Sequence, residues 1–207
     1  MDATSDYPLT IQIAGLGGQG VVLAGDILAE AALLADLNVK KSEIHGLSRR
    51  FGSVSCQVRI GTELYSPLRG HGGVDILLAL EGYEGLKHLP YLTSEGRGLF
   101  NRMWRKPGAV TNANDTAPVG CDDQRVSWFD GTELMHQAEC IRSLNYFMLG
   151  VLGTRLPIPE EAWDQAITGI TTKGLATNLE MFRTGRRIGL ASGPRYRYRV
   201  VTSELSG

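Results

Sequence analysis

The first third of the chain alternates short apolar runs with turns rich in glycine. Residues 11–14 form an apolar run that predicts a strand, and over residues 21–35 the apolar positions recur with the period of a helix. Apolar and polar side chains alternate over residues 54–60, which predicts a strand with one buried face. Residues 74–80 are almost continuously apolar, as in a central strand covered on both faces. These segments predict a sheet with helices packed on it.

Turns and segments without a clear period separate these elements. Gly61-Thr62 has the composition of a two-residue hairpin turn, and we expect residues 63–66 to return beside the preceding strand, which makes the sheet mixed. Residues 43–52 show neither a strand nor a helix period, so we predict a loop. The glycine-rich and basic residues 93–106 are also predicted to form a loop, either plainly exposed or in contact with a partner.

The second half of the chain is mainly helical in pattern. Asn145 and Asn178 fall inside apolar stretches of two predicted helices, where a buried amide is expected to be hydrogen-bonded and structural. Helices are predicted over residues 83–91, 132–138, 141–153, 160–170 and 176–187, and further short strands over residues 109–112, 125–129 and 195–199.

The order of these elements predicts the fold class. We expect an α/β protein with three α/β/α layers, a mostly parallel or mixed central sheet, a Rossmann-like first strand, turn and helix, and additional C-terminal helices. The length of 207 residues suits a single domain over residues 1–207, with a core at about 9–187 and a C-terminal extension over 188–207.

The composition narrows the classes of partner. A formal net charge of -1 gives no reason to expect nucleic acid or an anionic membrane surface. No apolar run approaches the length of a membrane span and the N-terminus lacks a signal-peptide pattern, so we expect a cytoplasmic protein. The widely spaced Cys56, Cys121 and Cys140 and the four histidines show no metal-ligand spacing, and no metal site is predicted.

The densest chemical signal is the run Gly15-Leu16-Gly17-Gly18-Gln19-Gly20 between the first strand and the first helix. A glycine turn at a helix N-terminus brings unpaired backbone N–H groups and the positive end of the helix dipole together, which suits an anion. The spacing fits the dinucleotide-binding fingerprint, in which an acidic residue after the second strand holds a ribose, and Glu43 lies at about the right distance. The alternative is that the glycines only fit a tight turn.

Four charged side chains are candidates for catalysis. Glu43 and His45 have the chemistry of a base and an acid, and Arg50 can clamp a carboxylate or a phosphate through its fork geometry. Glu81 ends the apolar central strand. Because ligands gather outside the carboxyl ends of parallel strands, we expect Glu81 and the glycine turn to face one crevice. Such residues are also common in ordinary loops, so spacing alone does not demonstrate an enzyme.

Motifs spread along nearly the whole chain point to a known family. They are residues 14–24, 41–46, 52–55, 58–61, 65–67, 75–81, 89–92, 106–108, 145–150 and 178–185. Together they closely resemble the smaller (beta) subunit of indolepyruvate ferredoxin oxidoreductase. They resemble more loosely the gamma subunit or domain of pyruvate and other 2-oxoacid ferredoxin oxidoreductases.

The resemblance implies an accessory subunit that works inside a larger complex. In such a complex the large subunit carries thiamine diphosphate and iron-sulfur clusters, decarboxylates a 2-oxoacid and passes electrons to ferredoxin, while coenzyme A collects the acyl group. We therefore expect a hetero-oligomer whose substrate is an aryl pyruvate such as indolepyruvate. Thiamine diphosphate and the iron-sulfur clusters are expected on the partner subunit, with none of them bound by this chain alone.

The resemblance also assigns residues by position. The glycine turn, expected to contact an anion or coenzyme A, comprises Gly15, Leu16, Gly17, Gly18, Gln19 and Gly20. A second motif, expected at the subunit interface near the active site, comprises Glu43, His45, Gly46, Arg50, Gly52 and Ser53.

Two departures from the family pattern leave alternatives open. Phe51 stands where the family often has a glycine, which leaves the choice of 2-oxoacid open to pyruvate or branched-chain substrates. Residues 93–105 look like an insertion that contacts a partner. Two other classes of function compete with the accessory subunit. One is a non-enzymatic nucleotide- or coenzyme A-binding module of the same fold, and the other is an independent nicotinamide dehydrogenase.

Overall fold

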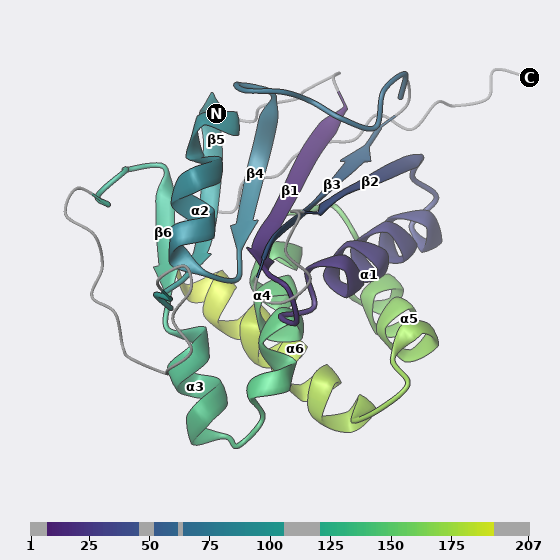
Figure 1. Ribbon diagram of the computed structural model, residues 1–207. Coiled ribbons are helices and arrows are strands. Elements are labelled where there is room, and N and C mark those ends of the chain that lie inside the picture. Colours follow the sequence, from purple (N-terminus) through teal and green to yellow (C-terminus); the bar gives the residue numbers. More distant parts are fainter. Residues whose placement is uncertain (1–7, 46–51, 62–63, 106–120, 193–207) are drawn as a thin grey trace, which may run out of the picture.

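The computed structural model describes residues 8–45, 52–61, 64–105 and 121–192. The predicted strands over 109–112 and 195–199, and residues 62 and 63 of the predicted hairpin, lie outside this part of the chain. The strands (Figure 1) are β1 (Leu9–Leu16), β2 (Val39–His45), β3 (Ser53–Ile60), β4 (Val74–Ala79), β5 (Leu92–Asn101) and β6 (Val126–Phe129). The helices are α1 (Val21–Leu34), α2 (Gly82–His88), α3 (Gly131–Gln137), α4 (Leu144–Gly153), α5 (Glu160–Ile170) and α6 (Leu175–Ala191), with single 3-10 turns at η1 (Leu89–Tyr91) and η2 (Ile141–Ser143).

The six described strands form one mixed sheet in the order β2-β3-β1-β4-β5-β6 (Figure 1). β1, β4, β5 and β6 pair in parallel, whereas β3 pairs antiparallel with both β1 and β2. The predicted mixed sheet is therefore confirmed. Because β3 lies between β1 and β2, the first strand, helix and second strand do not form the adjacent pair of a simple Rossmann unit.

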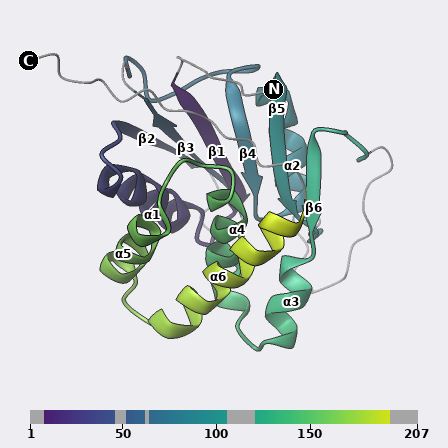
Figure 2. The ribbon, with the colours of Figure 1, turned by 180° about the vertical axis from the view of Figure 1, so that it is seen from behind.

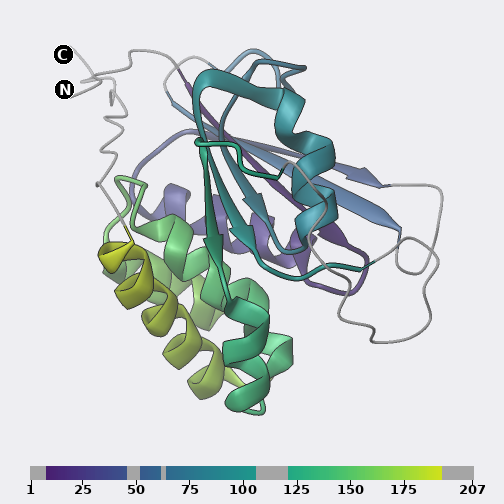
Figure 3. The same cartoon turned by 90° about the vertical axis from the view of Figure 1, so that its left-hand side faces the viewer.

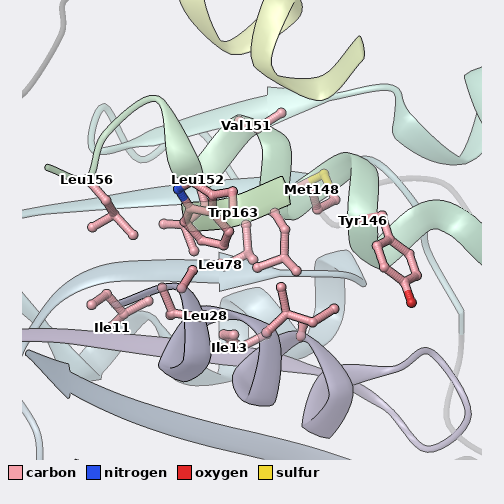
Figure 4. Packing of buried hydrophobic residues seen from close by; sticks show 14 of the residues in the cluster. Ile11, Ile13, Leu28, Leu78, Tyr146, Met148, Val151, Leu152, Leu156 and Trp163 are labelled. Carbon is pink, nitrogen blue, oxygen red and sulfur yellow. The ribbon is translucent and has the colours of Figure 1, made fainter. Parts of the chain in front are cut away.

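Helices cover the two faces of the sheet unequally. α1, α4, α5 and α6 lie on one face, and the short helix α2 lies on the other (Figures 2 and 3). The larger core lies under the four helices, where Ile11, Leu28 and Trp163 belong to one cluster (Figure 4). A smaller core beneath α2 includes Leu77 and Phe100. The predicted α/β/α layers are confirmed.

The face that carries α2 continues as a polar surface over β1 and β3. Residues 64–73 cross it without pairing as a strand, so the predicted hairpin is wrong. Side chains of the sheet bind the backbone of this segment instead. Gln57 Nε2 donates to the Arg69 carbonyl at 2.9 Å, and Gln57 Oε1 accepts the Arg69 N–H at 2.8 Å. The guanidinium of Arg59 donates to the carbonyl of Ser66. β3 is therefore buried on both faces, not on one as predicted.

Two segments predicted to be loops belong to strands. Residues 43–45 lie in β2, an edge strand, where polar side chains are tolerated because one side of the strand faces water. Residues 93–101 lie in β5, between β4 and β6. Glycine makes room there, since a Cβ on Gly98 would lie 2.8 Å from Cε1 of Phe100. The prediction of a loop over residues 93–101 is therefore wrong, because this segment is a strand of the sheet.

The helices predicted in the second half of the chain are confirmed. Two of them, α4 and α6, pack with their backbones in close contact. A Cβ on Gly150 of α4 would lie 2.0 Å from the carbonyl oxygen of Phe182. A Cβ on Gly185 of α6 would lie 1.9 Å from the carbonyl oxygen of Phe147. Only glycine allows so close an approach, so α4 and α6 form one tightly packed unit.

Candidate functional site

Several of the predicted motifs lie at the carboxyl ends of the parallel strands. The carboxyl ends of β1 and β4 are neighbours, and β3 begins beside the end of β1, where Leu16 pairs with Ser53. The N–H of Gly17 donates to the carbonyl oxygen of Gly52 at 2.9 Å. The glycine turn, the start of β3 and the end of β4 therefore meet, as the sequence predicts.

Part of the glycine turn is occupied by its own hydrogen bonds. The N–H of Leu16 donates to Oε1 of Gln19 at 2.7 Å, and the N–H of Gln19 donates to the carbonyl of Leu16 at 3.1 Å. Nε2 of Gln19 points to the carbonyl of Leu80 at 3.5 Å and to the sulfur of Met103 at 3.6 Å. The Gln19 side chain therefore fixes the turn from inside and does not face a ligand.

The other side of the turn is open. Gly18 and Gly20 have φ angles of 96° and 80°, in the left-handed region, and no side chain caps α1. Within the described residues no acceptor bonds to the N–H groups of Gly18, Gly20 or Val21. A Cβ on Gly18 would meet no atom of the described residues within 4 Å. Three donors and the positive end of a 14-residue helix thus converge on space that an anion can enter.

A buried amide faces this turn from α4. Asn145 is 2% exposed, yet its side chain has no hydrogen-bond partner in the described part of the chain. Its Nδ2 lies against Gly20, 2.6 Å from the point where a Cβ would stand. The expected hydrogen-bonded role of Asn145 is therefore wrong. Packing alone does not explain an asparagine at this position, because its amide is buried and makes no hydrogen bond to the described chain.

Asn178 on α6, by contrast, has the structural role that the sequence predicts. Its Oδ1 accepts the hydroxyl of Ser143 at 2.7 Å, and its Nδ2 donates to the carbonyl of Lys173 at 3.1 Å. These two bonds tie the segment before α4 to the segment before α6.

A pocket of about 450 Å³ lies beside the glycine turn on the helical layer. Leu23, three residues after Gly20, lines the pocket together with Tyr146 of α4. The exposed cations Arg142 and Lys173 lie on its wall. The pocket therefore adds space and positive charge close to the open donors of the turn.

Glu81 is buried and serves the backbone. One carboxylate oxygen accepts the N–H of Glu84 at 2.8 Å and so caps α2, and the other accepts the N–H of Arg105 at 2.9 Å. Burial raises the pKa of the Glu81 carboxyl. Glu81 lies next to the glycine turn as expected, but it points inward to α2 and the segment after β5, not into a shared crevice.

Ser53 is held by a residue that the sequence did not single out. Its Oγ donates to Oε2 of Glu84 at 2.5 Å, and Nζ of Lys87 donates to Oε1 of the same buried carboxylate at 2.5 Å. The i, i+3 spacing of Glu84 and Lys87 was visible in the predicted helix, but no local pattern links Glu84 to Ser53. Glu84 thus fixes the start of β3 against α2.

Glu43 does not occupy the ribose-binding position of a dinucleotide fold. It lies on β2, and β3 separates β2 from β1, so the two strands are about 10 Å apart. Its carboxylate accepts a hydrogen bond from Nζ of Lys41 at 2.6 Å, and Lys41 also binds Asp26 of α1 at 2.5 Å. Glu43 therefore cannot serve as the ribose-binding acid that the interpretation as an independent nicotinamide dehydrogenase requires.

The second motif is only partly within the described residues. His45 ends β2, and its backbone pairs with Val54 of β3. Gly46, Arg50 and Phe51 lie outside the described part of the chain. The roles of His45 as an acid or base and of Arg50 as an anion clamp stay predictions.

The described residues show no cluster of metal ligands, and Cys56 is an unreactive thiol. No group of three or more His, Cys, Asp or Glu side chains is placed there to hold a metal ion. Burial raises the pKa of the Cys56 thiol to about 12, which keeps it protonated and unreactive near neutral pH. No helix in that part of the chain is both long and apolar enough to cross a bilayer.

Comparison with known proteins places this fold and turn in a family. The family model for pyruvate ferredoxin/flavodoxin oxidoreductase matches residues 10–188. The chain belongs to this family. A relative named indolepyruvate oxidoreductase subunit IorB, from Thermococcus kodakarensis, is 30% identical over 187 residues, which are 84% of this chain and 93% of the relative. A relative of the same name from Methanothermobacter thermautotrophicus is 31% identical over 186 residues, 84% of this chain and 94% of the relative.

Another relative of this chain carries a different name. The 2-oxoglutarate synthase subunit KorC of Archaeoglobus fulgidus is 34% identical over 182 residues, 87% of this chain and 88% of the relative.

Solved structures of oxidoreductases share the fold. The 2-oxoglutarate:ferredoxin oxidoreductase of Magnetococcus marinus, solved with 2-oxoglutarate, coenzyme A and succinyl-CoA bound, matches with a TM-score of 0.73 at 22% identity, over 94% of this chain. This chain spans 33% of that longer one. The gamma subunit of a keto/oxoacid ferredoxin oxidoreductase from Geobacter sulfurreducens matches with a TM-score of 0.67 at 24% identity, over 88% of this chain and 99% of the subunit. The fold thus occurs both as a separate subunit and within a longer chain.

Proposed function

We propose that this chain is the accessory subunit of a thiamine diphosphate-dependent 2-oxoacid:ferredoxin oxidoreductase. The complex would oxidatively decarboxylate an aryl pyruvate of the indolepyruvate type, transfer the acyl group to coenzyme A and pass electrons to ferredoxin. The observation that carries the proposal is the match to two relatives named indolepyruvate oxidoreductase subunit IorB over 84% of the chain. The chain is not expected to be active alone.

The proposed partner is a large subunit that holds thiamine diphosphate and the iron-sulfur clusters. Support comes from the names of the relatives, each of which is called a subunit of an oxidoreductase or synthase. The hetero-oligomer is proposed to work in the cytoplasm, and ferredoxin would meet the large subunit and not this chain.

Coenzyme A is the ligand proposed for the glycine turn, where it would supply the thiol that accepts the acyl group. The open N–H groups of Gly18, Gly20 and Val21 fit an oxyanion, and the neighbouring pocket with Arg142 and Lys173 fits the bulk and charge of a nucleotide-derived cofactor. The bound coenzyme A in the Magnetococcus marinus structure supports this choice of ligand. The remaining residues of the turn and the start of β3 are proposed to hold these donors in place.

A second candidate substrate is 2-oxoglutarate. The relative named 2-oxoglutarate synthase subunit KorC has 34% identity, against 30% and 31% for the two relatives named IorB. Pyruvate and branched-chain 2-oxoacids, and a non-enzymatic coenzyme A-binding module, are the further alternatives that the experiment must separate.

The test is anaerobic purification of the native protein, followed by an assay of acyl-CoA formation with ferredoxin as electron acceptor. We expect a large subunit with thiamine diphosphate and iron-sulfur clusters to co-purify, and indolepyruvate to give the highest kcat/KM among indolepyruvate, phenylpyruvate, pyruvate, a branched-chain 2-oxoacid and 2-oxoglutarate. Omission of this chain should abolish turnover. A chain that purifies without such a partner, or a complex with no acyl-CoA product, contradicts the proposal.

A further inference from the structure

Asn145 is the polar side chain whose position packing does not explain. It is 2% exposed and has no hydrogen-bond partner among the described residues, and its Nδ2 lies against Gly20 at the start of α1. It is not sealed from solvent, because the fully enclosed unpaired polar atoms of the described side chains belong to Arg59, Trp163, Asp164 and Arg186. A ligand at the turn can therefore reach the amide.

The groups around Asn145 define what such a ligand must offer. Gly18, Gly20 and Val21 present N–H groups with no acceptor in the described chain, at the uncapped N-terminus of a 14-residue helix. All three groups are donors, and the helix dipole adds positive potential. With Nδ2 turned toward Gly20, Asn145 supplies a further donor from a second element. The set selects a ligand with several oxyanion acceptors.

We propose that Asn145 is a binding residue whose amide donates to a phosphate oxygen of a pyrophosphate held at the glycine turn. The ligand class is a nucleotide-derived cofactor with a pyrophosphate bridge. Four donors, two from the glycine turn and one each from the start of α1 and from α4, match the several oxygens of a pyrophosphate better than the two oxygens of a carboxylate. The pocket that begins at Leu23 gives the rest of such a molecule space and positive charge. The choice of coenzyme A as the natural example rests on the proposed function; the assignment of Asn145 does not.

The experiment compares Asn145→Leu with the unaltered full-length chain, using inorganic pyrophosphate and coenzyme A as probes in titration calorimetry and thermal unfolding. Leucine keeps the volume of the side chain but removes the donor. We expect the Kd for both probes to rise about tenfold or more, because a hydrogen bond to a charged group is lost, while the Tm is unchanged or higher.

Two further variants keep the result interpretable. Asn145→Ala also removes the donor but adds no atoms near Gly20. It should therefore show the same loss of affinity, even if leucine at this position clashes with its neighbours. Asn38→Ala, at an exposed asparagine beyond the opposite end of α1, should bind both probes as the unaltered chain does. An unchanged Kd in both Asn145 variants overturns the proposal, as does an unaltered chain that binds neither probe. Variants that lose affinity for a 2-oxoacid and not for pyrophosphate also overturn it, in favour of a carboxylate site.

The outcome can be separated from that of the proposed function. If Asn145→Leu loses pyrophosphate affinity and the native protein has no large subunit, the binding role stands and the enzymatic role fails. If the complex forms acyl-CoA and Asn145→Leu leaves both the Kd and the KM for coenzyme A unchanged, the enzymatic role stands and the binding role fails.

Discussion

Two asparagines on neighbouring helices have similar burial but opposite surroundings. Asn178 on α6 is 8% exposed, and both ends of its amide are hydrogen-bonded, to Ser143 and to the carbonyl of Lys173. Asn145 on α4 is 2% exposed and faces Gly20 without a partner. The Asn178 amide holds two segments of the protein together, whereas the Asn145 amide makes no hydrogen bond to the described chain.

The difference shows that one part of the protein is built for stability and another leaves groups open for binding. The tightly packed unit of α4 and α6 supplies a rigid wall, and the glycine turn of α1 lies against that wall with open donors. A buried polar residue with all its bonds made contributes to stability, whereas one with bonds unmade lowers stability until something binds. The two asparagines therefore predict opposite responses to the same substitution.

The largest expected effect is at the wall itself. Gly185→Ala places a methyl group 1.9 Å from the carbonyl oxygen of Phe147, so α4 and α6 must move apart. We expect the free energy of unfolding to fall by about 3 kcal/mol or more in denaturant titrations. Gly169→Ala, at an exposed position of α5 where a Cβ meets nothing within 4 Å, is the matched control and should be neutral or stabilising. Equal stability of the two variants would show that the wall is not rigid.

The next effect compares two glycines of the same turn. Gly20→Ala must adopt a φ of 80° and also displaces the amide of Asn145, whereas Gly18→Ala has a φ of 96° but open space around its Cβ. We expect losses of about 3 kcal/mol for Gly20→Ala and about 1–2 kcal/mol for Gly18→Ala, measured by thermal or denaturant unfolding. The pair isolates the contact with Asn145, because both positions pay a similar strain. Gly18→Ala as the more damaging change would contradict the geometry.

The asparagines can be compared directly by one substitution. Asn178→Leu leaves the hydroxyl of Ser143 and the carbonyl of Lys173 without their partner, so unfolding should become easier by about 2 kcal/mol. Asn145→Leu breaks no hydrogen bond to the described chain and should leave the unfolding free energy within about 0.5 kcal/mol or raise it. Urea titrations of both variants measure the two free energies of unfolding. A loss of stability in Asn145→Leu as large as that in Asn178→Leu would contradict the predicted difference between the two asparagines.

The smallest effect concerns Glu81, a buried group with its bonds made. Burial raises its pKa above the ordinary value of 4.5, so the folded protein binds this proton more tightly than the unfolded chain. The stabilising contribution is present at low pH and is lost as the pH rises from 4.5 through the raised pKa. The unfolding free energy of the unaltered chain minus that of Glu81→Gln should therefore fall as the pH is raised from 4.5 toward 8. An increase of this difference in unfolding free energy with pH would show that the pKa of Glu81 is lowered in the folded protein, not raised.

Much of the fold was accessible from the pattern of side chains. The strand at 54–60 and the long helices are periodic because each has a continuous apolar face, and the strand at 74–80 is apolar almost throughout because both its faces are buried. β5 was missed because its glycines suggested a turn, while in the structure Gly98 makes room for Phe100 and Gly96 lies against the carbonyl of Val74. The residues after β3 were misjudged because Gln57 binds their backbone with its side chain, an arrangement that no local period encodes.

The site was predictable only to the level of the turn. The run from Gly15 to Gly20 has a conformational requirement that shows in the sequence, because left-handed backbone favours glycine. The partners of Glu81, Ser53 and Asn145 come from distant segments, and a sequence without its fold does not show whether a polar side chain has a partner. Asn145 and Asn178 are equivalent in sequence context and differ only in what the fold places beside them.

The antiparallel strand between β1 and β2 limits how this scaffold can be redesigned. An engineer who wished to turn it into a nicotinamide-dependent enzyme would begin by placing an acid to bind the adenine ribose, and no substitution on β2 can do so across an intervening strand about 5 Å wide. The change would require deletion of β3 and rejoining of the chain, which would also displace Gly52, the residue before β3, and with it the backbone contact that steadies Gly17. In this architecture the strand order thus blocks a ribose-binding acid of the dinucleotide type, and point mutation alone does not change the strand order.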